Sequence, residues 1–118
     1  MSSPLMIVNG VIEGSPDTPL MHRIQDVSLV IEACFSAHVT SALLYPANLT
    51  SGFFDLSTRE AGEILQKLRQ YRVRLAVVCV PGAVQYSTMF GEMAIEEARI
   101  GHFRIFESPD DARAWLAR

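Results

Sequence analysis

The sequence predicts a single α/β domain built on a mixed, mainly parallel β-sheet. Short apolar segments alternate with segments whose apolar residues recur at helical spacing, which is typical of strands joined by crossover helices. One of the short segments, Leu75–Val80, is almost free of polar residues, as expected for a strand covered on both faces. The length of 118 residues fits one domain spanning residues 1–118.

The chain is expected to begin with a β-hairpin. Leu5–Val8 and Val11–Glu13 flank Asn9-Gly10, a pair that favours the positive φ angles of a two-residue turn. This hairpin would place one antiparallel strand at or near an edge of the sheet.

A first helix is predicted after Asp26, whose carboxylate is suited to cap the N–H groups of a first turn. A strand at Ala42–Tyr45 follows and stops at Pro46. The predicted buried face of the helix consists of Val27, Leu29, Val30, Ile31, Cys34 and Phe35.

A second helix is predicted from Thr58 to Tyr71. Ser57 and Glu60 have the spacing of a capping box, in which each side chain bonds a backbone N–H of the other residue. The predicted buried positions of this helix are Ala61, Ile64, Leu65, Leu68 and Tyr71.

The last third of the chain predicts a helix, a strand and a final helix. Val84–Arg99 is the third helix, with Gly101 as its stop, and Phe103–Phe106 is a half-exposed strand. Ser108-Pro109 then opens a fourth helix, since serine caps well and proline suits the first helical position.

Composition narrows the classes of function. Hydrophobic residues make up 49% and charged residues 19%, which supports a folded core rather than disorder. The net charge of −3 argues against nucleic acid or an anionic membrane as a partner. Because no apolar run is long enough to span a membrane and the N-terminus is unlike a secretory signal, we expect a cytoplasmic protein.

No metal or cofactor site is expected. The three histidines are far apart in sequence and share no metal-ligand spacing, the two cysteines are isolated from each other, and no phosphate-binding glycine loop is present. Pro81-Gly82 follows a strand and precedes a helix, a position where parallel sheets often bind ligands. One glycine there does not indicate a nucleotide.

The stretch from Phe53 to Leu65, FFDLSTREAGEIL, contains the candidate binding site. Helix capping and periodicity explain the residues from Ser57 onward, but they leave two aromatic side chains and a carboxylate in the preceding loop. We predict a binding surface at this loop and at the first turn of the helix. Its residues are Phe53, Phe54, Asp55, Ser57 and Thr58.

The same stretch resembles a bacterial family known only as domain of unknown function 4180. The similar residues are Phe53–Leu56, Thr58, Ala61–Lys67 and Tyr71, and the resemblance extends from the hairpin to the C-terminus. This resemblance implies no known activity.

The order of elements is also similar to that of STAS domains, which occur in sulfate transporters and anti-sigma-factor antagonists. STAS domains carry a serine in a loop before a helix, and its phosphorylation breaks a partner complex. Asp55-Leu56-Ser57-Thr58 has the corresponding position here. The resemblance implies phosphorylation of Ser57, and helix capping is the competing explanation of this serine.

The sequence thus predicts a STAS-like regulatory or binding module that is not an enzyme. Its partner would be a protein or a small ligand, and it could form a homodimer. The alternative is a small hydrolase or isomerase that uses Asp55 and Glu63, with His38 as a third candidate.

Overall fold

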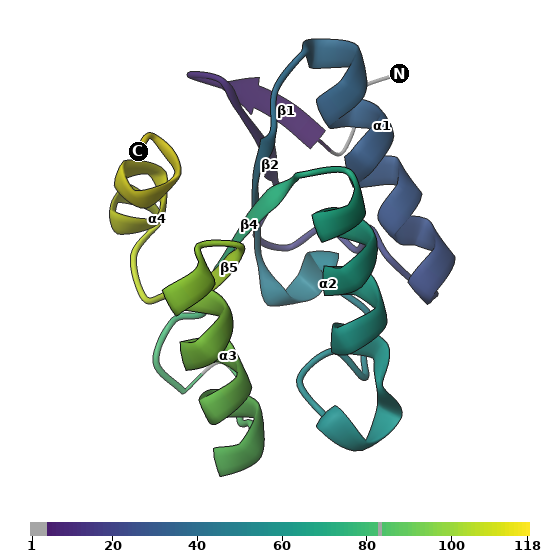
Figure 1. Ribbon diagram of the computed structural model, residues 1–118, viewed down its shortest axis with the longest axis vertical. Coiled ribbons are helices and arrows are strands. Elements are labelled where there is room, and N and C mark those ends of the chain that lie inside the picture. Colours follow the sequence, from purple (N-terminus) through teal and green to yellow (C-terminus); the bar gives the residue numbers. More distant parts are fainter. Residues whose placement is uncertain (1–4, 83) are drawn as a thin grey trace.

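The computed structural model, which describes residues 5–82 and 84–118, contains a five-stranded sheet with four α-helices (Figure 1). The strands lie in chain order, and all pairs are parallel except β1 with β2. The strands are β1 Leu5–Val8, β2 Val11–Gly14, β3 Ser41–Leu44, β4 Arg74–Val78 and β5 Phe103–Phe106. The helices are α1 Val27–Ala37, α2 Glu60–Gln70, α3 Thr88–Ile100 and α4 Pro109–Leu116. The predicted fold class is confirmed.

The N-terminal hairpin forms as predicted. Val8 pairs with Val11, and the two turn residues between them have positive φ, 48° at Asn9 and 80° at Gly10. Asparagine tolerates this left-handed region better than most residues and glycine has no side chain to clash, so the pair fixes the register of β1 on β2.

Helices α1, α2 and α3 cover one face of the sheet and form its main core (Figure 1). Alternate strand residues point into this layer because successive side chains of a strand face opposite sides. The strand residues of this core are Ile12, Ala42, Leu44, Leu75, Val77 and Phe103, and the helices add Val27, Val30, Cys34, Ala61, Ile64, Leu65, Leu68, Phe90 and Ala94.

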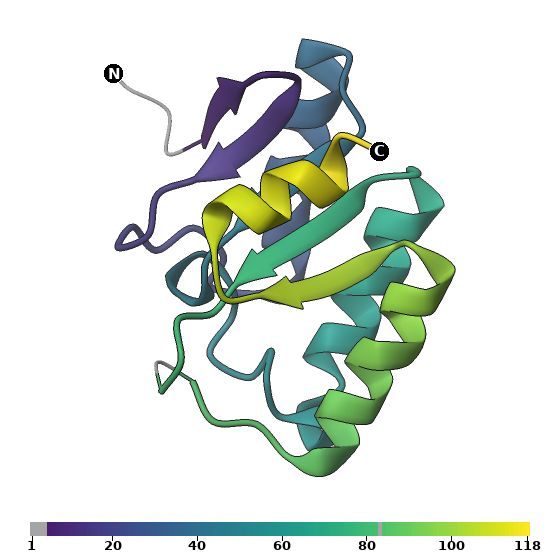
Figure 2. The same ribbon diagram turned by 90° about the vertical axis from the view of Figure 1, so that its left-hand side faces the viewer.

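Helix α4 lies across the opposite face, above β3, β4 and β5 (Figure 2). Its buried residues are Ala112, Trp115 and Leu116, which pack on Val11, Leu43, Ala76 and Val78.

Two arginines hold α4 in place. Arg113 donates to both carboxylate oxygens of the buried Glu13 on β2, at 2.7 and 2.9 Å. The guanidinium of Arg74 stacks 4.3 Å from the ring centroid of Trp115 and donates to the carbonyl of the same residue at 3.3 Å. These contacts join the last helix to strands β2 and β4.

Some details of the predicted helices are wrong. Leu29 and Phe35 on α1 are 42% and 81% exposed and Tyr71 at the end of α2 is 57% exposed, although all three were expected in the core. Asp26 precedes α1 but makes no side-chain cap there, because its carboxylate accepts the N–H groups of His22 and Arg23 instead. The third helix begins at Thr88, four residues later than Val84, where Ser87 caps the N–H of Phe90.

Asn48 ties together the chain segments that leave β2 and β3. Its buried side-chain amide donates to the carbonyls of Ser15 and Thr18 at 2.9 and 2.7 Å and accepts the N–H of Tyr45 at 2.8 Å. Gly14, the last residue of β2, packs directly against this amide, so that a Cβ atom at this position would overlap it. The close approach of strand and amide requires glycine here.

We predict opposite effects for two glycine-to-alanine substitutions. Gly14→Ala should lower the free energy of unfolding by about 2–4 kcal/mol, because it displaces an amide with three buried hydrogen bonds. Gly62→Ala, on an open face of α2 with no atom near the added methyl, should raise it by about 0.5–1 kcal/mol. Urea denaturation of both variants and the wild type measures the difference. Equal stabilities for the two variants would contradict this view of Asn48.

Candidate functional site

The predicted site lies in the segment that follows β3 and leads to α2. Phe53 anchors this segment, because its ring is fully buried and makes edge contacts with Phe90 of α3 and Phe103 of β5, at centroid distances of 6.0 and 5.9 Å. A side chain without exposed surface cannot contact a partner directly. Phe53 therefore supports the loop rather than forming its surface.

Phe54 is half-buried and connects the loop to the segment before α3. Its ring meets the edge of Phe53 at 5.2 Å and stacks on Tyr86, with centroids 6.3 Å apart and ring planes inclined by 23°. Such aromatic pairs stabilise contacts beyond the area that they bury. Two loops from different strands are thus held together at the carboxyl edge of the sheet.

Asp55 is exposed, and one of its two carboxylate oxygens is fixed. Oδ1 accepts the hydroxyl of Ser57 at 2.6 Å and the N–H of Ser57 at 3.0 Å. These bonds favour the ionised carboxylate and hold the pKa of Asp55 below its usual value of 3.8, with the hydroxyl as the larger cause. Within the described residues no hydrogen bond reaches Oδ2, which is free to accept one from a ligand.

The predicted capping box of Ser57 and Glu60 is wrong. Leu56–Thr58 form a separate 3₁₀ turn that Asp55 caps, and α2 begins only at Glu60 after Arg59 adopts a left-handed φ of 63°. The hydroxyl of Thr58 lies 2.7 Å from the carbonyl of Gly52 and accepts the N–H of Glu60 at 3.2 Å. Thr58, not Ser57, therefore joins the loop to the start of the helix.

Phe54 and Asp55 line an open hollow of about 520 Å³ at the carboxyl edge of the sheet. The polar groups around it are Asp55, His22, Thr50, Ser51 and Gln85. Thr50 is 3% exposed, and its buried hydroxyl has no hydrogen-bond partner among the described residues. The apolar part of the lining consists of Pro19, Met21, Pro46, Ala47, Leu49, Phe54 and Val84.

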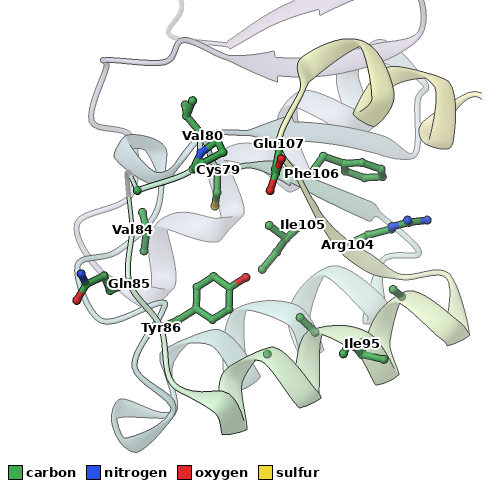
Figure 3. Close-up of a pocket in the computed structure, with 15 residues that line it drawn as sticks. Cys79, Val80, Val84, Gln85, Tyr86, Ile95, Arg104, Ile105, Phe106 and Glu107 are labelled. Carbon is green, nitrogen blue, oxygen red and sulfur yellow. The ribbon is translucent and has the colours of Figure 1, made fainter.

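A second hollow of about 720 Å³ lies beside β5 and α3 (Figure 3). The chain leaves β4 toward α3 on one face of the sheet and leaves β5 toward α4 on the other, and ligands of parallel sheets often bind between such strands. Pro81-Gly82 lies in its lining, as do Tyr86 and Glu107, which approach from different sides (Figure 3). Burial raises the pKa of the Cys79 thiol to about 11, so this lining cysteine is not an activated nucleophile.

Comparison with known protein families identifies the family of this chain. The family described as domain of unknown function (DUF4180) matches residues 8–116. The chain belongs to this family. No curated protein and no solved structure was found to match it.

The groups considered for catalysis in this DUF4180 domain do not converge. Glu63 lines a different groove, on the outer side of α2 with Ile24 and Lys67. His38 ends α1 ahead of the amino end of β3, whereas Asp55 follows the carboxyl end of that strand. No three metal-ligating side chains cluster within residues 5–82 and 84–118, and no helix described there is long and apolar enough to cross a membrane.

Sequence reasoning missed His22, Thr50, Ser51, Gln85 and Tyr86 as neighbours of the site. A positional signal for them exists, since each lies in a segment that follows the carboxyl end of β2, β3 or β4. In a parallel sheet these ends meet at one edge, so segments distant in sequence come together there. Only Pro81-Gly82 was recognised in this way.

We predict that Ser57→Ala raises the pKa of Asp55 without restoring it to 3.8, because the hydroxyl donor is lost and the backbone donor remains. Carbon-detected NMR of the carboxyl groups across acidic pH measures this. Asp26 is the control, since its pKa is lowered mainly by the N–H groups of His22 and Arg23 and should not change. An unchanged pKa of Asp55 would show that the bond to the Ser57 hydroxyl is absent in solution.

Proposed function

We propose that this DUF4180 domain is a non-catalytic, cytoplasmic binding module that takes up a cationic side chain of a partner protein. The observation that carries the proposal is the state of Asp55. One oxygen of this carboxylate is held by Ser57, the other accepts no hydrogen bond from the described residues, and Asp55 lines the same open hollow as the half-exposed ring of Phe54.

The chemistry of the hollow favours a guanidinium or an ammonium group. An exposed aspartate is ionised at neutral pH, and the lowered pKa of Asp55 acts in the same direction. A carboxylate with a free oxygen accepts charge-assisted hydrogen bonds from Arg or Lys. The ring of Phe54, which lines the hollow and is backed by Tyr86, adds aromatic surface of the kind that attracts cations. Gln85 supplies a further amide acceptor at the rim.

The shape of the hollow favours a protein over a small ligand. Small-molecule pockets usually bury most of the ligand surface. Here the side chains that surround the opening, His22, Ala47, Ser51, Asp55 and Gln85, are themselves exposed. A side chain carried on a partner surface needs less enclosure, because its backbone already orients it.

Ser57 provides a means of regulation. Its hydroxyl is exposed and bonded to Asp55, and the STAS-like order of elements is the reason for expecting phosphorylation at this position. A phosphate on Ser57 would add about two negative charges next to Asp55. Repulsion between the two groups would break the bond and alter the hollow, so phosphorylation would change partner affinity.

A pull-down from native cell extract, compared between variants, tests the binding function. Phe54→Ala combined with Asp55→Asn should reduce recovery of the specific partner by about tenfold or more, because the ring and the charge are removed together. Glu63→Gln is the matched control, since it neutralises an exposed carboxylate outside the hollow and should leave recovery unchanged. Phe53→Ala is unsuitable because the ring belongs to the core. Equal partner recovery by a folded double variant would overturn the proposal.

A further inference from the structure

The outer edge of β5 is a second candidate binding surface, because backbone N–H and C=O groups point outward there. Among the strands of residues 5–82 and 84–118, β5 is the last of the sheet and pairs only with β4 (Figure 2). The N–H groups of Leu75 and Cys79 bond the carbonyls of His102 and Phe106, so the even-numbered residues of this strand point their backbone groups toward β4. By the alternation of a strand, the N–H and C=O groups of Phe103 and Ile105 point away from the sheet.

The β5 edge lacks most of the features that usually prevent a strand of another molecule from pairing with an exposed edge strand. Proteins protect edge strands with proline, bulges, inward charges or a covering element. The four residues of β5, Phe-Arg-Ile-Phe, include no proline or glycine and pair with β4 without interruption. The one charge, Arg104, lies over the ring of Phe106 at 5.0 Å from its centroid.

We propose that β5 pairs with β5 of a second copy of this chain, in antiparallel orientation about a two-fold axis at Ile105. The two five-stranded sheets would then form one continuous sheet of ten strands. Ile105 would exchange two backbone hydrogen bonds with its equivalent, and Phe103 would pair with Glu107 of the second copy. The outward backbone groups of each strand are thereby satisfied.

The side chains of β5 favour this register. Arg104 would face Phe106 of the second copy, so each guanidinium would lie near one phenyl ring from each chain. Neither Arg104 nor Glu107 would face its own equivalent, and no like charges would be opposed. The edge is therefore complementary to itself, as a two-fold interface requires.

Helix α3 extends the same surface. It lies beside the edge, and its residues Gly91, Ala94, Ile95 and Ala98 line the hollow of about 720 Å³ next to β5 (Figure 3). Ile95 is 63% exposed at the rim of this hollow. In the proposed dimer the two α3 helices lie on the same face of the joined sheet, and Ile95 of each copy is covered by the other.

The opposite edge of the sheet provides the matched comparison. Ile7 on β1 is 62% exposed, close to the exposure of Ile95. Pairing of β1 with β5 of another copy would join two different surfaces, and such contacts give rings or open filaments but no two-fold dimer. A two-fold dimer through β5 satisfies both copies equally.

Sedimentation equilibrium of the full chain tests the dimer. The wild type should form a two-chain species, and Ile95→Lys should weaken it by about tenfold or more because a charge enters the covered surface. Ile7→Lys should leave the dimer unchanged. A wild type that remains monomeric at all soluble concentrations would overturn the proposal, as would a dimer that only Ile7→Lys disrupts.

Amide hydrogen exchange by NMR tests the register independently. The N–H groups of Phe103 and Ile105 should be protected in concentrated protein and should lose this protection on dilution. Those of Arg104 and Phe106, which face β4, should stay protected at every concentration. A dimer with fast exchange at Ile105 would rule out pairing through β5.

Discussion

The winding of the sheet in a single direction is the constraint on which the rest of this structure depends. After the hairpin, each crossover places the next strand beside the last, so strands β2 to β5 follow chain order and three helices share one face. The segments that leave β2, β3 and β4 consequently meet at one edge, where they form the hollow with Asp55. The same winding leaves the other face for α4 and makes β5 the edge strand of the sheet in the described part of the chain.

Two residues, Phe53 and Asn48, fix the loops of the candidate site to the sheet. Phe53 fixes the loop after β3 to α3 and β5, so Phe54 and Asp55 are presented from a rigid base. Asn48 joins the segments that follow β2 and β3, since its side chain bonds Ser15, Thr18 and Tyr45 and its carbonyl accepts the N–H of Met21. Preorganised side chains lose less conformational entropy on binding, which suits an open hollow with few polar groups.

The sequence was sufficient for the strands and the turn, because Asn9-Gly10, the apolar run at Leu75 and the alternation at Phe103 are local signals. It was not sufficient where one side chain had a choice of partners. Asp26 and Ser57 precede helices, but the side chain of Asp26 bonds His22 and that of Ser57 bonds Asp55 instead of capping those helices. Phe35 and Tyr71 fit the apolar pattern of their helices, yet both side chains are exposed. The loop of Phe54 and Asp55 was chosen as the candidate site from the sequence, but its neighbours His22 and Gln85 were not, since only the sheet brings them near Asp55.

If a partner protein docks at the hollow of Phe54 and Asp55, photo-crosslinking in cells will capture it there. A benzophenone amino acid placed at Ser51, which is exposed in the lining of the hollow, should yield a specific crosslinked product. The same probe at Gln66, exposed on α2, should yield none. Loss of the Ser51 product on adding Asp55→Asn would support the account. A product that is equally strong from both positions, or unaffected by Asp55→Asn, would contradict it.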